Sequence, residues 1–293
     1  MVQKRCSLNK QVTLEILGSG GATTIPKPLC GCKICEEARQ KGYPYKRTAP
    51  SVFIHGPDIL FDTPEEIKYQ LERAQVKNIN ACFYSHWHPD HTAGSRLWEI
   101  NKNGRRLPKI LRTTPIYLAS NVDDTFSQHG LRERFDYYQK NGWTQNNVIA
   151  LDQPIEIFGL AITSFQMAEE YAVGFDIRVN NKKILLIMDE TCNWQPPEKY
   201  RHYDLVIMPT GITEFHPLTG QRQIPLEHPI LKTEPSFENT LAMIEILQAK
   251  RVILSHIEEG DGLSHDDWQE VQAKLAEKNI HIDPAFDGMK IDL

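Results

Sequence analysis

The stretch from Ser85 to His91, SHWHPDH, constrains this chain more than any other part of its sequence. It places three of the 11 histidines of a 293-residue chain within six positions, directly after the apolar run 81–84. Neutral imidazole and carboxylate are ligands that divalent metals such as zinc take in proteins, and a catalytic site keeps one position open for water. The pattern H-x-H-x-D-H therefore predicts a metal site at the end of a buried strand.

His86 and His88 are two positions apart, so at the end of an extended segment both side chains point to the same side and can chelate one ion. Asp90 and His91 follow where the chain must turn, and they can face a second ion beside the first. The alternative, a solvated loop of histidines that binds no metal, is disfavoured by this spacing.

Short apolar runs with alternating polar residues recur along the chain and predict β-strands. They cover residues 12–17, 51–56, 58–63, 81–86, 154–165, 173–179, 182–190, 204–210, 251–256 and 289–293. Strands in both halves, with amphipathic stretches between them, predict an α/β fold of two mixed sheets packed face to face with helices outside. We expect one domain over residues 1–293, with an insertion or lid at about 96–147, a span rich in Arg, Gln and Asn.

Helix-start signals mark the amphipathic stretches. In Thr63-Pro64-Glu65-Glu66, an N-cap threonine, a proline at N1 and a glutamate at N3 predict a capping box. Residues 264–267 open a second helix in the same way, and residues 236–250 form a third. Asn180-Asn181 is expected at the tip of a hairpin.

The net charge and the N-terminal sequence limit the kinds of partner that we expect for this protein. A formal net charge of −5 and a pI of about 6.1 give no basic field for nucleic acid. The N-terminus has no apolar signal region, and no segment approaches the length of a membrane span, so we expect a soluble, cytoplasmic protein. The expected partner is a small-molecule substrate, with neither nucleic acid nor membrane, and a homodimer is allowed for.

Three of the six cysteines lie in the element CGCKIC, which does not resemble the disulfide framework of a secreted domain. Cys30, Cys32 and Cys35 form C-x-C-x-x-C, a spacing that lets three thiolates reach one zinc ion in a closed structural site. The alternative is a loop with three free cysteines.

With these motifs, the sequence resembles the metallo-β-lactamase superfamily, whose defining motif is H-x-H-x-D-H after a buried strand. The resemblance extends along most of the chain: the first aspartate of the family corresponds to Asp62 in LFDT, its bridging aspartate to Asp189 in LLIMDE and its late histidine to His256 in VILSH. It implies a four-layer αββα sandwich. The segments LGSGGATTIP, CGCKIC, RTAPS and FDGMKI are similar to the phosphodiesterase branch typified by the cyclic-phosphate hydrolase of the carbon–phosphorus lyase pathway.

The resemblance also implies a ligand set, residue by residue. His86 and His88 would bind a first metal, Asp189 would bridge, and the second metal would be held by Asp90, His91 and His256. Asp62 would orient a ligand histidine by hydrogen bonding, so Asp62 and Asp90 are counted among the catalytic residues. The expected cofactors are zinc or manganese at this centre, as one or two ions, and a structural zinc at the cysteine element.

Three departures from the family pattern stand out. The family supplies a further histidine to the first metal after the strand that ends here at Phe165, but this sequence continues QMAEEYAVG, without a histidine. Three explanations are open: Glu169 or Glu170 is the ligand instead, the first site is weak, or the protein binds a single ion. No histidine directly precedes the helix that begins near Ser236, which leaves His228 as the candidate general acid. The fourth ligand of the cysteine site in the branch is a histidine at the position of Glu259; His265 is the preferred replacement here.

Together these features predict a metal-dependent hydrolase, with a phosphodiesterase acting on a small phosphodiester or cyclic phosphate as the first hypothesis. A lactonase or thioesterase would use the same ligands against a carbonyl. An RNA-processing nuclease of the same fold should carry a basic arm, and none is present in the sequence. A degenerate member of the fold that binds a ligand without hydrolysing it is the hypothesis outside enzymes.

Overall fold

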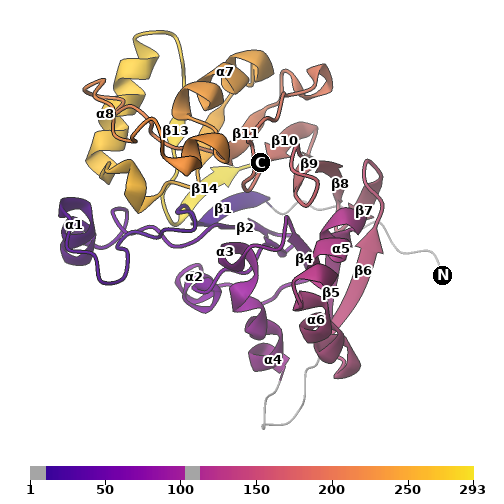
Figure 1. The fold of residues 1–293 in the computed structure, drawn as a ribbon. Coiled ribbons are helices and arrows are strands. Elements are labelled where there is room, and N and C mark those ends of the chain that lie inside the picture. The colour runs from indigo at the N-terminus through magenta and orange to yellow at the C-terminus, as the bar shows by residue number, and fades with distance from the viewer. Residues whose placement is uncertain (1–10, 103–112) are drawn as a thin grey trace.

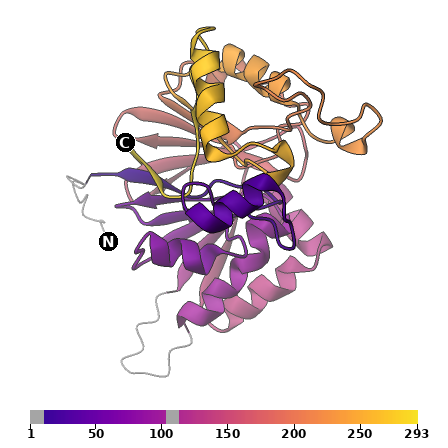
Figure 2. The ribbon, with the colours of Figure 1, turned by 90° about the vertical axis from the view of Figure 1, so that its left-hand side faces the viewer.

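The computed structural model of the protein describes residues 11–102 and 113–293. Two seven-stranded sheets pack face to face, and helices cover their outer faces (Figure 1, Figure 2). The αββα sandwich that the sequence predicts is confirmed.

The first sheet comes from the N-terminal half of the chain and is completed at one edge by the last strand. Its order is β14-β1-β2-β3-β4-β5-β6. The strands are β1 (Thr13–Gly18), β2 (Ser51–His55), β3 (Ile59–Phe61), β4 (Ala81–Tyr84), β5 (Thr114–Ala119), β6 (Thr144–Ile149) and β14 (Met289–Asp292). Strands β3 to β6 run parallel, so their carboxyl ends share one edge of the sheet.

The second sheet has the order β13-β12-β11-β10-β9-β8-β7. Its strands are β7 (Pro154–Ile157), β8 (Leu160–Gln166), β9 (Val173–Val179), β10 (Lys182–Leu186), β11 (Leu205–Pro209), β12 (Val252–Ser255) and β13 (Asp283–Pro284). Strands β10 to β13 run parallel. The hairpin between β9 and β10 is confirmed: Val179 pairs with Lys182, and Asn180 and Asn181 at the tip have the positive φ angles that such a turn requires.

The sheets meet through apolar side chains from their inner faces. Phe61 on β3 and Phe83 on β4 contact Phe175 on β9, with ring centroids 5.0 and 6.0 Å apart, and all three side chains are buried. Large aromatic rings contribute much of the burial in such a core. Phe61 is the last residue of β3 and Phe83 the next to last of β4. This contact therefore lies next to the segments that follow these strands and carry Asp62 and the histidine motif.

Helices flank each sheet. With the first sheet lie α2 (Ile67–Arg73), α3 (Pro89–Thr92), α4 (Leu97–Lys102), α5 (Ser120–Gln128) and α6 (Leu131–Lys140), and with the second lie α7 (Phe237–Leu247) and α8 (His265–Ala276) (Figure 1). Helix α1 (Lys33–Lys41) packs in a small apolar cluster of its own. Of the helices in the described ranges, none has the length and apolar character to cross a membrane.

Of the two capping predictions, one is confirmed and one is wrong. Ser264 caps α8 through a capping box, as expected, and the helix predicted over residues 236–250 is α7, which Ser236 caps in the same way. Thr63 does not cap α2, which begins at Ile67. The Thr63 hydroxyl instead forms a hydrogen bond with the Tyr84 hydroxyl at 2.7 Å, and its backbone N–H donates to the carbonyl of His91. Thr63 is fully buried and ties the loop after β3 to the histidine motif.

The prediction of an insertion or lid at about 96–147 is wrong for the part that the structure describes. Residues 114–149 contribute β5, α5, α6 and β6, two strands of the first sheet with the helices between them. Ile116 and Leu118 on β5, like Phe126 and Phe135 on the helices, are fully buried in the main core. Residues 103–112 of the predicted span lie outside the described residues.

Candidate metal centre

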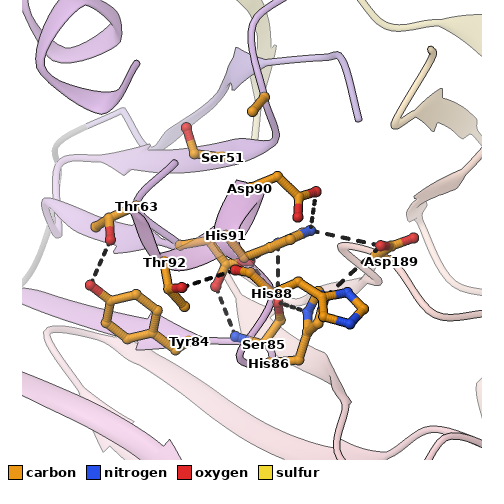
Figure 3. A network of polar contacts seen from close by, with 12 residues as sticks. Ser51, Thr63, Tyr84, Ser85, His86, His88, Asp90, His91, Thr92 and Asp189 are labelled. Carbon is orange, nitrogen blue, oxygen red and sulfur yellow. Dashed lines mark hydrogen bonds and ion pairs between the residues drawn. The ribbon is translucent and has the colours of Figure 1, made fainter. Parts of the chain in front are cut away.

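The histidine motif forms the turn that follows β4. His88 precedes the short helix α3, which begins with Pro89 and carries Asp90 and His91. Figure 3 shows the side chains of the motif converging with Asp189, which reaches the site from the other sheet. The turn after β10 supplies Asp189 and the turn after β12 supplies His256, so parallel strands of both sheets deliver the polar residues to one end of the sandwich.

The first ligand group contains His86, His88, Asp189 and Glu190, and the candidate ligand atoms lie within 4.8 Å of one another. His88 Nδ1 is 3.1 Å from Glu190 Oε1. His86 Nε2 is 3.9 Å from that same oxygen and 3.9 Å from Asp189 Oδ2. Two imidazoles and two carboxylates around one point are a donor set that suits divalent transition metals.

The second ligand group contains Asp90, His91, Asp189 and His256, again within 4.8 Å. Asp90 Oδ2 is 3.3 Å from His91 Nε2 and 3.5 Å from His256 Nε2. Asp189 Oδ2 is 3.8 Å from His91 Nε2 and 3.2 Å from His256 Nε2. Asp189 therefore belongs to both groups and faces histidines of both through one oxygen.

Unpaired buried atoms show that the two groups fit bound cations. Among the described residues, four side-chain atoms of these groups are buried without a hydrogen-bond partner: His86 Nε2, Asp90 Oδ2, His91 Nε2 and His256 Nε2. Buried polar atoms in folded proteins are nearly always paired. Lone pairs that converge on one place without donors are what metal ions would satisfy.

Asp62 and Ser85 determine which ring nitrogens face the centre. Asp62 Oδ2 is 2.7 Å from His91 Nδ1, and Asp62 also accepts hydrogen bonds from the backbone N–H and the hydroxyl of Ser85 at 2.8 and 2.6 Å. The Ser85 hydroxyl, having donated to Asp62, can accept from His86 Nδ1 at 3.0 Å. With protons held on Nδ1, His91 and His86 both present the lone pair of Nε2 to the centre.

The pKa values of His86 and His91 are shifted in opposite directions, because the two rings have different neighbours. Burial lowers the pKa of His86 well below its usual value, which favours the neutral imidazole that binds metal. Burial opposes protonation of His91 as well, but the carboxylates of Asp90 and Asp62 outweigh it and raise the pKa of His91 to about 10. Without a bound cation, the carboxylates of the second group therefore favour a second proton on His91, and a cation that binds Nε2 would replace that proton.

Glu190 is the fourth member of the first ligand group, and the prediction that Glu169 or Glu170 substitutes for the missing histidine is wrong. Neither of those two joins a ligand group among the described residues, and Glu170 is exposed. Glu190 follows Asp189 directly and has a positive φ of 60°, which turns its side chain to the same centre. Burial next to Asp189 raises the pKa of Glu190 to about 8, as expected for two adjacent carboxyl groups without a cation.

The glycine-rich segment 18–21 supports His256 from behind. A Cβ atom on Gly21 would lie 2.4 Å from His256 Nδ1 and 2.6 Å from Glu258 Oε1. The backbone N–H of Ile257 donates to the carbonyl of Ser19 at 3.0 Å, which joins this segment to the chain that carries His256. Gly21 is therefore needed for the approach of the His256 ring.

A cavity of about 500 Å³ opens over the two ligand groups, with five of their residues on its floor: His88, Asp90, Asp189, Glu190 and His256. One part of its wall is apolar and includes Ile212, Ile224 and Ile230. The rest carries carboxyl groups, and the described residues that line the cavity include neither lysine nor arginine. His228 lines the cavity too, but it is exposed, and its Nδ1 accepts a hydrogen bond from the backbone N–H of Ile230 at 3.2 Å.

The cysteine element forms a separate group. Cys30, Cys32 and Cys35 lie with Glu259 within 4.8 Å of one another, and both Cys30 Sγ and Cys32 Sγ are 3.2 Å from Glu259 Oε1. The prediction of His265 as the fourth member is wrong: its ring, at the first residue of α8, packs on Tyr45 with centroids 5.5 Å apart. Three thiols and a carboxylate fit a four-coordinate structural zinc.

A two-sheet sandwich with paired ligand groups at the ends of its strands defines the class of metal-dependent hydrolases of the metallo-β-lactamase fold. The family model of the beta-lactamase superfamily domain matches residues 56–257, and the chain belongs to this family. The matched segment contains both ligand groups and begins after the cysteine element 30–35.

Solved structures and a sequence relative extend the comparison. A diphosphatase from the PhnP family superposes with a TM-score of 0.71 and 23% identity, over 97% of this chain and 98% of that one. Zn²⁺-bound PqqB from Methylobacterium extorquens gives a TM-score of 0.74 and 17% identity, over 96% and 100%. An octanoyltransferase of Porphyromonas gingivalis is 27% identical over 156 residues, which are 50% of this chain but only 29% of that protein. At these identities the two structures show the shared fold alone.

Proposed function

We propose that the protein is a metal-dependent phosphodiesterase that hydrolyses a small phosphodiester or a cyclic phosphate. The observation that carries the proposal is the position of Asp189 Oδ2, which faces His256 at 3.2 Å, His91 at 3.8 Å and His86 at 3.9 Å. One carboxylate between two imidazole sets is the arrangement expected of two adjacent cation sites. When bound, a pair of divalent ions supplies a water nucleophile that is active at neutral pH and stabilises charge on the phosphoryl oxygens.

The residues of the chain hold this site in place. Asp62 and Ser85 keep the Nε2 atoms of His91 and His86 directed at the centre. The contact of Phe61 and Phe83 with Phe175 fixes the two sheets, and with them the separation of Asp189 from the histidine motif. Such preorganisation places the reacting groups before the substrate arrives.

The charge of the wall favours a diester over a monoester. The described wall has no lysine or arginine that could meet the second negative charge of a phosphomonoester, whereas a diester carries one charge. A volume of about 500 Å³ suits a small organic phosphate. Metal in the ligand groups would be zinc or manganese, and the cysteine group would hold a structural zinc.

Hydrolysis of a lactone or thioester is the second candidate. It is favoured by the apolar part of the wall, formed by Ile212, Ile224 and Ile230, and the name of the octanoyltransferase refers to an acyl group. The same ligand groups would serve a carbonyl substrate. A non-catalytic role has less support, because Glu190 is a fourth candidate ligand in the group for which the sequence offered no further histidine.

Turnover by the metal-loaded protein separates these candidates. We expect hydrolysis of bis(p-nitrophenyl) phosphate to exceed hydrolysis of p-nitrophenyl phosphate and of a γ-lactone, and to be abolished by a chelator. The His88→Ala and Asp189→Ala variants should lose turnover, while His281→Ala, an exposed histidine away from the centre, should keep it. Faster turnover of the lactone would favour the second candidate, and full activity of both centre variants would contradict a metal mechanism.

A further inference from the structure

Hydrolysis of a diester needs a proton for the departing oxygen, and the cavity wall has few groups that can provide one. Apart from the ligand groups, its titratable residues in the described part of the chain are His228, Glu234, Glu258 and Asp261. Each has a different set of contacts, and these contacts decide which side chain is available to a substrate.

Glu258 and Asp261 are engaged in holding the loop after β12. Glu258 accepts hydrogen bonds from the backbone N–H and the hydroxyl of Thr23, both at 3.2 Å. Asp261 is buried and accepts from the backbone N–H of Thr213 at 3.2 Å and from the backbone N–H of Glu258 at 3.1 Å. Both carboxyl groups are structural acceptors.

His228, the general acid expected from the sequence, precedes the short helix η3 (Pro229–Lys232) and accepts from its Ile230 N–H. It is exposed at the rim of the cavity, so solvent rather than the protein determines the position of its second nitrogen. An exposed side chain of this kind is poorly held for proton transfer to one substrate atom.

Glu234 is placed differently. It lies on the cavity wall and is half-buried, and its carboxyl group forms no hydrogen bond with another of the described residues. Its backbone is fixed on both sides: the Glu234 N–H donates to Ile230 at 2.9 Å, and the carbonyl of Pro235 accepts from Ile212 at 2.9 Å. A Cβ on Gly211 would lie 2.6 Å from that Pro235 carbonyl, so the segment packs closely on the strand end beside it.

The surroundings favour the protonated form of this carboxyl group. Burial, together with the negative charge of Asp189, raises the pKa of Glu234 to about 7. The charges of Asp189, Asp90 and Glu258 raise the pKa of Glu234, and the charge of His256 lowers it. Glu234 in turn raises the pKa of Glu190 and of Cys192. Burial, which does not depend on bound cations, thus favours the neutral carboxyl form of Glu234.

We propose that Glu234, two residues before the N-cap Ser236 of α7, is the general acid of this site. The inference rests on the proposed function. In the step, the oxygen of water forms a bond to phosphorus, and the bond between phosphorus and the leaving oxygen breaks. The proton of the Glu234 carboxyl group passes to that oxygen, which departs as an alcohol. The attacking water releases one proton to solvent and the Glu234 carboxylate regains one from solvent, so the products are a phosphomonoester and an alcohol.

Leaving groups of different acidity test the assignment. We compare kcat/KM of the metal-loaded protein for bis(p-nitrophenyl) phosphate, whose leaving group needs little protonation, and for methyl p-nitrobenzyl phosphate, whose alcohol leaving groups need a proton. In Glu234→Gln, the ratio of the first rate to the second should rise about 100-fold or more, since a positioned acid contributes on the order of 10²–10⁴. Glu234→Asp should restore part of the loss.

His228→Gln is the matched control, because it removes from the same wall the residue that the sequence predicted as the general acid. Its ratio should equal that of the unmodified protein. With the unmodified protein, the rate on the alkyl ester should fall at high pH, as the acid loses its proton, and this limb should disappear in Glu234→Gln.

The outcomes separate the two proposals. An unchanged ratio in Glu234→Gln, with both esters hydrolysed by the unmodified protein, overturns the role of Glu234 and leaves the phosphodiesterase standing. A raised ratio in His228→Gln instead assigns the acid to His228 and also overturns it. If the unmodified protein hydrolyses neither diester, the proposed function itself fails.

Discussion

Asp62 Oδ2 lies 2.7 Å from Nδ1 of His91, and both side chains are completely buried. Asp62 follows β3 and His91 lies on α3, so this pair joins the loops after two adjacent parallel strands. The hydrogen bond selects the tautomer whose Nε2 faces Asp90 and Asp189. The hydrogen bond therefore depends on β3 and β4 being neighbours in the first sheet, and it determines which nitrogen of His91 is available to a metal ion.

The Asp62→Asn variant should weaken metal binding at the second ligand group. An amide can donate to His91 Nδ1 and so favour the wrong tautomer, and loss of such outer partners typically costs about 10–100-fold in metal affinity. Titration with a chromogenic chelator measures the change. Asp152→Asn, at an exposed aspartate that pairs with Lys199, is the matched control and should bind like the unmodified protein.

The Glu190→Gln variant should lose the ion of the first ligand group, so that metal content at the histidine centre falls from about two ions per chain to about one. Its Oε1 is the nearest carboxylate oxygen to His88 Nδ1, at 3.1 Å. Elemental analysis after dialysis against metal-free buffer provides the count. Glu170→Gln, an exposed change in the segment where a ligand was expected, should keep both ions, and a loss there would contradict our assignment.

The Gly21→Ala variant should reduce turnover about 100-fold with little loss of folding. The new methyl group would lie 2.4 Å from His256 Nδ1, so the ring must move, and a shift of about 1 Å at a reacting centre costs on this order. Gly31→Ala, where a Cβ meets nothing within 4 Å, is the control. Circular dichroism and kcat measured on both variants distinguish displacement of the ring from unfolding.

Replacement of Glu259 by alanine should release the structural zinc and lower the Tm, because the energy of a structural metal site contributes to folding. Glu259 Oε1 is 3.2 Å from two of the three thiols, whereas His265 packs on Tyr45. His265→Ala should retain the zinc. A zinc that survives Glu259→Ala and is lost in His265→Ala would restore the histidine as the ligand.

Much of the fold could be predicted because its signals are local. The hairpin tip at Asn180 and Asn181 and the cap at Ser264 involve residues a few positions apart. Strand β5 was missed because its short run lies in a polar stretch, and its burial comes from α5 and α6, which pack beside it. Thr63 resembled a cap, but a distant partner, Tyr84, takes its hydroxyl.

The residues of the candidate site that belong to a sequence motif could be predicted, whereas those that reach the site only through the fold of the chain could not. The histidine motif could be located from its own pattern, and Asp189 and His256 from the resemblance to the family, because each follows an apolar run at the place that the family pattern gives. Glu190 could not be distinguished from a surface charge, since its direction depends on a positive φ that no local pattern announces. Glu234 acquires its setting only when the loop before α7 folds over the ligand groups. The adjacent pair Asp189-Glu190 at a strand end was the available signal.

The central claim is a pair of cation sites that share Asp189. Metal content per chain, measured by elemental analysis on protein purified without added metal and on its Cys30→Ala/Cys32→Ala variant, tests it most directly. The account predicts about three ions in the unmodified protein and about two in the variant. A content of one ion that disappears with the cysteines would contradict the account, because the histidine centre would then hold no metal.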